Sequence, residues 1–523
     1  MSFLSLKKLL AFVVLIVSVM CLSSCWPFSA GSDGSLLGRP LRVGVVTWPG
    51  YAGGLVANNG FKPNKDCIFW NGHKQTVEFL LIEDADVRAK AFAKGGPDGV
   101  DIVWSTVDFW ANELPGFVKD GTKARAIMQV DWSRGGDAIV ADQSIKTIED
   151  LKGKKISLAL FTPSHWLLEY SLENSKLNDL EQADIVKNLV GKNASPDARA
   201  DFVANKVDAA VVWEPDVTEA ISKRPGAHIL FSSKTAANLI ADIMVAREDF
   251  IKDHPDVIKA FVQGWLEGAV EANRNSDKAV NLLVENEPTY TQFGPQTTKQ
   301  TLSSVKLADL TDNTRMFGLD GKSEPLFNRI FAQAGQAWVK RGYITNALAP
   351  DQAADLSFLK EYYALNPVTV SENEFTNFDK NKPPPTTAPV MSKPVSIYFA
   401  TGSSTLDPNA KAALDSVVTL VKTASNAYIR VEGNTDNVGS AATNKPLSQR
   451  RAQAVADYLA QAAKVDKARF EVVGNGSDVP FDVKLTDSSG QRRVATPAEI
   501  AASNSTEQGR TNNRRTEIQV IPR

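Results

Sequence analysis

Cysteine and histidine are scarce in this chain. Of 523 residues only three are cysteine and four are histidine, and the histidines are scattered at His73, His165, His228 and His254. No Cys/His set has the spacing of a metal site, and neither the GxSxG nor the HExxH motif of hydrolytic enzymes is present. The sequence therefore predicts no metal site, no cofactor and no enzyme.

Excess positive charge and membrane-length apolar runs are also missing. Lys and Arg number 58 against 60 Asp and Glu, a formal net charge of −2, which argues against a general nucleic-acid binder. The one long apolar run, Leu9–Met20, is too short to span a bilayer comfortably. A chain of 523 residues is too long for one core, so we expect two or three domains.

The first 25 residues have the pattern of an export signal. Two lysines precede the apolar run, and Leu22-Ser23-Ser24-Cys25 follows it. This tetrapeptide resembles the lipobox of bacterial lipoproteins, which implies that residues 1–24 are a signal peptide and that Cys25 carries the lipid anchor. The alternative is an ordinary cleaved signal with Cys25 incidental. Because Trp26 stands where inner-membrane lipoproteins commonly have Asp, the resemblance implies a periplasmic protein anchored in the outer membrane rather than the inner one.

This interpretation determines which cysteines are available to form a disulfide. Cys21 leaves with the signal and Cys25 is lipidated, so Cys67 has no partner. We therefore expect no structural disulfide, even in an oxidising compartment. Cys67 is expected to be a small buried hydrophobic side chain.

The rest of the chain divides by composition. Residues 25–39 are rich in Gly and Ser and predict a tether. Residues 40–365 alternate short β-branched runs with helical patterns, which predicts an α/β domain with a mainly parallel sheet covered on both faces. Residues 366–392 contain NKPPPTTAP, which favours an extended, semi-rigid linker. Residues 393–523 form a smaller α/β unit of the order βαβαβ-β, within the usual size of a domain.

The pattern also predicts individual elements. In the larger domain the expected strands are 41–46, 101–104, 125–130, 137–141, 155–160, 207–213 and 242–246, and the expected helices are 51–59, 76–94, 164–175, 197–205 and 255–273. In the smaller domain the expected strands are 395–399, 428–432, 470–473 and 516–521, and the expected helices are 408–423 and 448–462.

Six short segments stand in order along residues 393–523: Ile397–Phe399, Leu406–Pro408, Val431–Gly439, Asn444, Leu447–Ala452 and Gly509–Arg515. Together they resemble the OmpA-like peptidoglycan-binding domain. The resemblance implies binding of diaminopimelate, whose side chain ends in an amine and a carboxylate and so needs one fixed anion and one fixed cation.

In that family an Asp after a strand takes the ammonium group, and an Arg on the next helix takes the carboxylate through paired hydrogen bonds. The matching positions are Asp436 and Arg451, and Asn444 matches a further ligand contact. We expect Arg451 in the first turn of a helix capped by Ser448. The alternatives are a turn-capping role for Asp436 and a solvated helix face for Arg451.

Two departures from the family pattern stand out. An acidic residue is common after the first strand, where this chain has Ala400-Thr401, so one contact at the rim is lost. The loop at 477–503 is longer than usual and is expected to affect access to the site or its specificity. The roles of Arg510, Arg514 and Arg515 stay open between a solvated stripe, holding the fold and contacting glycan.

The larger domain has its own set of motifs: Leu41–Tyr51, Val100–Asp108, Ser133–Val140, Ile148–Ile156, Val207–Pro215 and Phe250–Val270. They resemble periplasmic solute-binding proteins of the nitrate, sulfonate and taurine type. The resemblance implies two α/β lobes joined by two crossovers, with the second lobe near 135–232 and the solute in the cleft between them.

Open α/β sheets bind ligands at the carboxyl ends of their strands. The residues predicted at those ends or beside them are Trp48, Trp104, Ser105, Thr106, Trp132, Ser133, Trp166, Trp213 and Glu214. A single buried Trp is more often part of a core, but five together indicate a Trp-lined cleft.

The charge of the solute stays open at this point. Glu214, Asp131 and Asp108 favour a cation, which aromatic faces also attract. The segments Ser105-Thr106 and Ser133–Gly136 favour an anion, because helix N-termini with hydroxyl and N–H groups bind anions. The slight preference is for a small organic ligand with an apolar or aromatic body.

Two functions fit the sequence. In the first, the chain binds a small solute and is anchored to peptidoglycan, and an ABC permease is a candidate partner within the linker's reach of at most ~100 Å. In the second, it is a structural tether between outer membrane and wall, whose N-terminal domain contacts other proteins or has lost solute binding.

Overall fold

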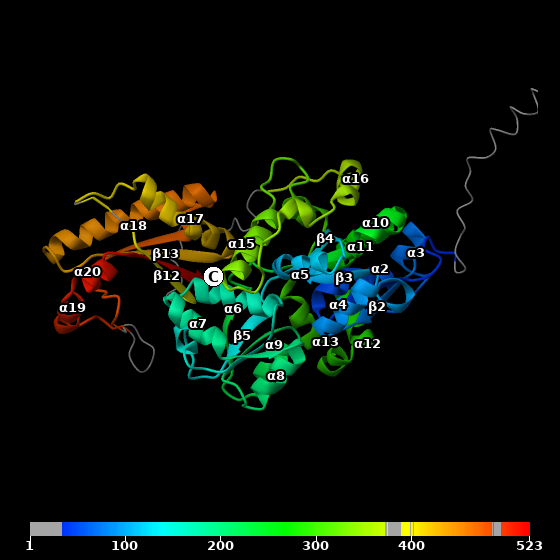
Figure 1. The fold of residues 1–523 in the computed structure, drawn as a ribbon, viewed down its shortest axis with the longest axis horizontal. Coiled ribbons are helices and arrows are strands. Elements are labelled where there is room, and N and C mark those ends of the chain that lie inside the picture. Colours follow the sequence, from blue (N-terminus) through cyan, green and yellow to red (C-terminus); the bar gives the residue numbers. More distant parts are fainter. Residues whose placement is uncertain are drawn as a thin grey trace, which may run out of the picture.

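The computed structural model describes residues 34–371, 374, 389–397, 399–400, 402–483, 485 and 493–523. The predicted signal peptide with Cys25, most of the tether and most of the Pro-rich linker lie outside these residues. Three separate β-sheets of six, five and four strands organise the described chain. In Figure 1 the four-stranded sheet and its helices lie at the left, the five-stranded sheet in the lower middle and the six-stranded sheet at the right.

The six-stranded sheet belongs to the first lobe and has the order β11-β4-β10-β3-β1-β2. Its strands are β1 (Leu41–Val45), β2 (Val77–Leu81), β3 (Ile102–Thr106), β4 (Ala124–Ser133), β10 (Ala241–Arg247) and β11 (Val305–Leu307). Its α-helices are α2 (Ala52–Asn58), α3 (Ile68–His73), α4 (Ala85–Lys94), α5 (Val107–Lys119), α10 (Glu248–Asp253), α11 (Pro255–Arg274), α12 (Ser276–Asn286), α13 (Pro288–Leu302), α14 (Leu310–Phe317), α15 (Leu326–Lys340) and α16 (Ser357–Leu365). Short 3-10 helices are η1 (Pro49–Tyr51), η2 (Gly96–Asp98) and η4 (Pro350–Gln352).

The five-stranded sheet forms the second lobe and has the order β7-β6-β8-β5-β9. Its strands are β5 (Asp137–Ala141), β6 (Ile156–Ala159), β7 (Leu189–Lys192), β8 (Ala209–Trp213) and β9 (His228–Ser232). Its helices are η3 (Ile148–Leu151), α6 (Pro163–Glu173), α7 (Asp179–Lys187), α8 (Ser195–Val203) and α9 (Asp216–Lys223). The chain enters this lobe between β4 and β5 and leaves it between β9 and β10, so two crossovers join the lobes.

The α/β class and the two-lobe architecture are confirmed, but the expectation of a mainly parallel sheet is wrong. Strand β1 pairs in parallel with β2 and β3, whereas β10 runs antiparallel to β3 and β4. In the second lobe β5 runs antiparallel to β8 and β9. Strands β5 and β10 each enter their sheet from the other lobe, so each begins at the edge that faces the cleft. The neighbouring parallel strands end at that edge, and β5 and β10 therefore run antiparallel to them.

The helix predicted over 76–94 is also wrong, because β2 and α4 divide that stretch. In Val77–Leu81 the buried Val77 and Phe79 alternate with the half-buried Glu78, which is the period of a strand. Helix α4 then begins after Asp84, whose carboxylate accepts a hydrogen bond of 2.9 Å from the backbone N–H of Val87.

The four-stranded sheet has the order β12-β15-β13-β14. Its strands are β12 (Met391–Val395), β13 (Ala427–Asn434), β14 (Phe470–Gly476) and β15 (Thr516–Pro522). Its helices are α17 (Pro408–Thr423), α18 (Ala441–Ala463), η5 (Lys467–Arg469), α19 (Pro497–Ser503) and α20 (Glu507–Asn513).

Two predictions in this domain need correction. The first strand precedes the predicted 395–399, and the second helix begins at Ala441, capped by Ser440, whose hydroxyl accepts from the Thr443 N–H at 3.2 Å. Ser448 therefore lies inside the helix, where its hydroxyl accepts from the Gly476 N–H at 2.9 Å. Arg451 lies in the third turn of the helix, not the first.

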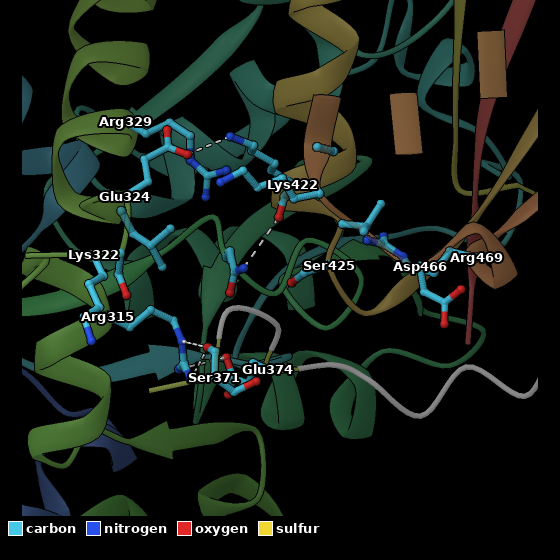
Figure 2. A pocket seen from close by; sticks show the side chains of 16 residues that line it. Arg315, Lys322, Glu324, Arg329, Ser371, Glu374, Lys422, Ser425, Asp466 and Arg469 are labelled. Carbon is cyan, nitrogen blue, oxygen red and sulfur yellow. Dashed lines mark hydrogen bonds and ion pairs between the residues drawn. The ribbon is translucent and has the colours of Figure 1, made fainter. Parts of the chain in front are cut away.

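The C-terminal domain packs against the two lobes. The Lys176 ammonium of the second lobe lies 3.1 Å from the carboxylate of Glu517, and the Asn238 N–H donates to the Thr423 carbonyl at 3.2 Å. Figure 2 shows the pocket at this junction, with a volume of about 260 Å³, where Lys422 reaches Glu324 at 2.8 Å.

Candidate functional site

Three of the predicted tryptophans meet between the lobes. Trp48 and Trp104 come from the first lobe and Trp213 from the second, and all three are buried. The ring centroids of Trp104 and Trp213 lie 6.2 Å apart with an interplanar angle of 67°, an edge-to-face contact. With Val46, Tyr51, Asp137, Pro163 and Asp242, these rings line a cavity of about 10 Å³. Such a space holds about one water molecule.

The other two predicted tryptophans do not line this cavity. Trp166 on α6 packs against Trp338 of α15, with ring centroids 5.9 Å apart, and so belongs to the contact that joins the lobes. Trp132, at the end of β4, lies against the guanidinium of Arg134, which is 5.1 Å from the ring centroid. Both indole rings are almost fully buried, as expected of core tryptophans.

The predicted polar residues serve mostly as local supports. Ser105 donates to Glu113 at 2.8 Å, and the Thr106 hydroxyl caps α5 by accepting from the Phe109 N–H at 3.3 Å. Ser133 shares a 2.7 Å hydrogen bond with Ser233, which ties the two crossovers together. All three side chains are fully buried, and their hydroxyl groups are used within the protein.

Glu214 has a more direct relation to the cleft. It follows Trp213 at the end of β8, and its carboxylate accepts hydrogen bonds from the Thr218 N–H at 3.1 Å and the Thr218 hydroxyl at 2.9 Å. Burial raises the pKa of Glu214 to about 7. The charge of Glu214 also raises the pKa of Asp137.

Asp137 and Asp242 line the cavity, although the sequence prediction did not include them. Asp137 is the first residue of β5 and pairs in register with Trp213. Asp242 on β10 stands opposite Asp131 on β4, and the Tyr51 hydroxyl donates to it at 2.7 Å. Asp131 in turn accepts from the Trp48 indole N–H at 3.0 Å. The sequence signal was weak, because an isolated Asp at the start or middle of a strand has no distinctive motif.

These carboxyl groups are held in an environment that disfavours their charge. Burial raises the pKa of Asp131 and of Asp108 to about 8 and that of Asp137 to about 7, and the pKa of Asp242 lies well above its usual value. Neighbouring carboxylates raise these values further: Asp131, Asp137 and Asp108 all act on Asp242. Perturbed carboxyl groups in a cleft are typical of functional sites.

Arg134, which the anion interpretation placed near the ligand, faces away from the cavity. Its guanidinium contacts the Ala237 carbonyl and the side chain of Asn238, and it pairs with Glu374 at 2.7 Å. It therefore connects the crossover with a residue of the predicted linker. Burial lowers its pKa, against the opposing effect of Glu374.

Cys67 is buried at the start of α3 and has no disulfide. Its sulfur accepts a hydrogen bond from the Trp70 N–H at 3.4 Å, and burial raises the pKa of the thiol. Across the described ranges, no group of three or more His, Cys, Asp and Glu is arranged to hold a metal ion. No helix in those ranges is both long and apolar enough to cross a membrane.

In the C-terminal domain, Asp436 and Asn444 lie together. Asp436 follows β13, and one of its carboxylate oxygens accepts from the Val438 N–H at 3.1 Å. The Asn444 amide, on α18, donates to the carbonyls of Asp436 at 3.3 Å and Val438 at 3.1 Å. Asn444 therefore fixes the turn that presents Asp436.

Arg514 is the partner that the sequence prediction left open. From the end of α20 its guanidinium donates to the second carboxylate oxygen of Asp436 at 2.8 Å and to Glu507 at 2.8 Å. Arg510 also pairs with Glu507, and Arg515 pairs with the buried Glu517 at 2.6 Å. Arg514 thus belongs to the Asp436 turn, whereas Arg515 holds the sheet.

Arg451, on α18, contacts the loop that follows β12. Its guanidinium donates to the Ser403 carbonyl at 3.0 Å and the Ala400 carbonyl at 3.4 Å, and it stands 4.8 Å from the centroid of the Phe399 ring. Burial lowers its pKa, and the charge of Asp436 opposes that effect. The long loop returns to this region at Asn504, whose side chain accepts from the Asn437 N–H at 3.3 Å.

Two family models match the chain. Residues 133–279 match the family described as NMT1/THI5 like, and residues 398–493 match the OmpA family. Neither is a family of enzymes, in agreement with the sequence prediction.

Similar proteins divide along the same line. Outer membrane protein A of Bordetella avium is 32% identical over 27% of this chain, which spans 62% of that protein's length. The peptidoglycan-binding protein ArfA of Mycobacterium bovis is 36% identical over 24% of the chain and 32% of its own length. A binding protein of Brucella abortus is 23% identical over 47% of the chain and 71% of its own length. In the structure of the alkanesulfonate-binding protein SsuA from Xanthomonas axonopodis, 15% identity extends over 60% of this chain and 97% of that one, with a TM-score of 0.46.

These matches fall on the two parts of the chain that the fold separates, the lobes around the cleft and the four-stranded C-terminal sheet. One part of the chain therefore matches the NMT1/THI5-like family, and the C-terminal part matches the OmpA family.

Proposed function

We propose that this protein is a periplasmic lipoprotein that binds a small solute between its lobes and is held on peptidoglycan by its C-terminal domain. The observation that carries the proposal is the cavity between the lobes, where three tryptophan rings surround buried carboxyl groups. A concave, mostly apolar site with a few convergent polar groups is typical of small-ligand binding. The name of the Brucella protein, a binding protein, supports the same function.

The proposal for the wall-binding half is that Asp436 takes the ammonium of diaminopimelate and Arg451 takes its carboxylate. A carboxylate offers about four lone-pair positions, and the described contacts of Asp436 use two of them. A guanidinium has five N–H donors, of which Arg451 uses two on the loop at Ala400 and Ser403. Both groups therefore keep capacity for a ligand. The name of the mycobacterial relative, a peptidoglycan-binding protein, supports this role.

The proposed lipid on Cys25 would hold the N-terminus at the outer membrane, and peptidoglycan would hold the other end. Solute capture would then take place in the space between membrane and wall. Delivery to an inner-membrane ABC permease is part of the proposal only if the permease lies within reach of the tethered lobes.

The decisive experiment is ligand detection on the detergent-solubilised full chain. Native mass spectrometry on protein purified from its own host, combined with a thermal-shift screen, should reveal a bound small molecule or stabilisation by one chemical class. If a broad screen shows neither, solute binding is contradicted.

One observation favours the second function, a structural tether. The cavity has a volume of only about 10 Å³, so in this closed arrangement side chains fill most of the cleft. A tether predicts that the lobes stay closed in solution. Small-angle scattering that shows an open and a closed form, exchanged by solute, would contradict the tether.

A further inference from the structure

The cleft brings together several buried carboxyl groups, and no basic side chain lines the cavity beside them within the described residues. Asp131 and Asp242 stand directly opposite each other on β4 and β10, a placement in which like charges destabilise a sheet. Asp137 approaches from the second lobe and acts electrostatically on both. All three are buried. Protein cores avoid such groups unless something pairs with them.

Two buried basic residues of this part of the chain, Arg88 and Arg134, are paired with other carboxylates. Arg88 pairs with Glu113 and stacks on the Trp104 ring, with its guanidinium carbon 5.0 Å from the ring centroid. Arg134 points to Glu374 and the crossover. Within the described residues, no Lys or Arg lines the cavity.

One carboxylate oxygen at the cavity lacks any partner. Asp137 is 2% exposed, and its Oδ1 has no hydrogen-bond partner among the described residues. Asp131 likewise keeps one oxygen unpartnered, while the other accepts from Trp48. A buried acceptor left without a donor is costly, and a ligand that brings N–H groups removes that cost.

The rings that line the cavity suit the same ligand. Trp48, Trp104 and Trp213 surround it, and the negative face of an indole attracts a cation within about 6 Å. Aromatic rings together with carboxyl groups that have no basic partner favour an ammonium group as the ligand.

We propose that the solute is a small organic cation whose ammonium group is held between the lobes by Asp137 and Asp242, against the faces of Trp48, Trp104 and Trp213. This inference rests on the proposed solute-binding function and names its ligand class. Because the closed cavity accepts only a group of about the size of one water, the ammonium head enters it, and a longer body requires the lobes to part.

The test measures binding to the full chain by calorimetry, with probes that differ mainly in charge. Methylammonium and ethylammonium are compared with the neutral molecules methanol and ethanol, and with the anions methanesulfonate and nitrate. We expect binding of at least one cation and no binding of its neutral counterpart. Binding of the anions without the cations would overturn the cation assignment and leave solute binding intact. If none of the six probes binds, the result contradicts the cation assignment and also argues against solute binding.

The variant Asp137→Asn keeps the shape of the side chain and removes its charge. It should weaken the affinity for the cation by at least about 30-fold, the lower end of the effect of breaking a buried charge pair. The exposed Asp253→Asn is the matched control and should bind as the wild type does. Equal affinities of Asp137→Asn and the wild type would overturn the assignment. If Asp137→Asn does not fold, the comparison of charged and neutral probes on the wild type decides alone.

Discussion

Asp131 and Asp137 illustrate how burial changes the behaviour of single residues here. Each is buried beside other carboxyl groups, and burial is the main cause of their raised pKa values, about 8 and about 7. In the unfolded chain the pKa of an Asp is about 3.9. A carboxyl group whose pKa is higher in the folded state stabilises the protein fully below its unfolded pKa, and this contribution is lost as the pH rises through 7 to 8.

The raised pKa of Asp137 predicts how the melting temperature of the solute-free protein depends on pH. Asp137→Asn has no proton to lose, so its melting temperature should rise relative to the wild type between pH 5 and pH 8.5. Calorimetric melting at both pH values checks this, with Asp253→Asn as the control. A melting-temperature difference that is the same at both pH values would contradict the raised pKa.

The proposal for wall binding can also be tested at single residues. Asp436→Ala and Arg451→Ala should each weaken co-sedimentation of the full chain with purified peptidoglycan, by about 2–5 kcal/mol if the pair is desolvated in the complex. The exposed neighbour Arg450 gives the control Arg450→Ala, which should bind normally. Retained binding in both site variants would mean that diaminopimelate is not held here.

At the level of elements, the closeness of the two lobes depends on a glycine in the first crossover. A Cβ on Gly136 would lie 2.4 Å from an atom of the Trp48 ring, and that ring is fixed by its hydrogen bond to Asp131. Gly136 therefore lets β5 approach the end of β1.

Gly136→Ala should keep the lobes from closing and cost about 1–3 kcal/mol of stability, the usual effect of overpacking. Amide hydrogen exchange should increase around Asp137 and Trp48. Gly116→Ala, where a Cβ meets no atom within 4 Å, is the control. Unchanged exchange in the first variant would show that the crossover adapts.

At the scale of the whole molecule, the C-terminal domain is docked on the lobes through charged contacts. Glu517 is buried, and although burial alone would raise its pKa, Arg515 and Lys176 hold it at about 2. Lys176 is the member that belongs to the second lobe, so it carries part of the contact between domains.

Lys176→Ala should loosen this contact and enlarge the radius of gyration measured by small-angle scattering, while Glu517 keeps Arg515 as its partner. Lys152→Ala removes a comparable ion pair within the second lobe, with Glu181 at 2.7 Å, and should leave the radius unchanged. The same radius in both variants would mean that the ion pair does not hold the domains.

The sequence by itself determined most of the architecture. Local period, the proline-rich stretch and two ordered sets of motifs predict two domains and the strand ends where Trp48, Trp104 and Trp213 lie, because these depend on residues close in the chain. The two crossovers were expected only from the resemblance to a known family. It misplaced the start of α18, where Ser440 rather than Ser448 is the cap, and it missed β2, because short elements carry little periodic signal.

Only the tertiary structure decided which side chains share the cleft. Strand register places Asp242 opposite Asp131 and Asp137 beside Trp213, although about a hundred residues of chain separate the first two. The same folding turned Arg134 away and left Trp132 and Trp166 in the core. The charge of a site is the sum of groups brought together from distant strands, so it depends on contacts that no local pattern encodes.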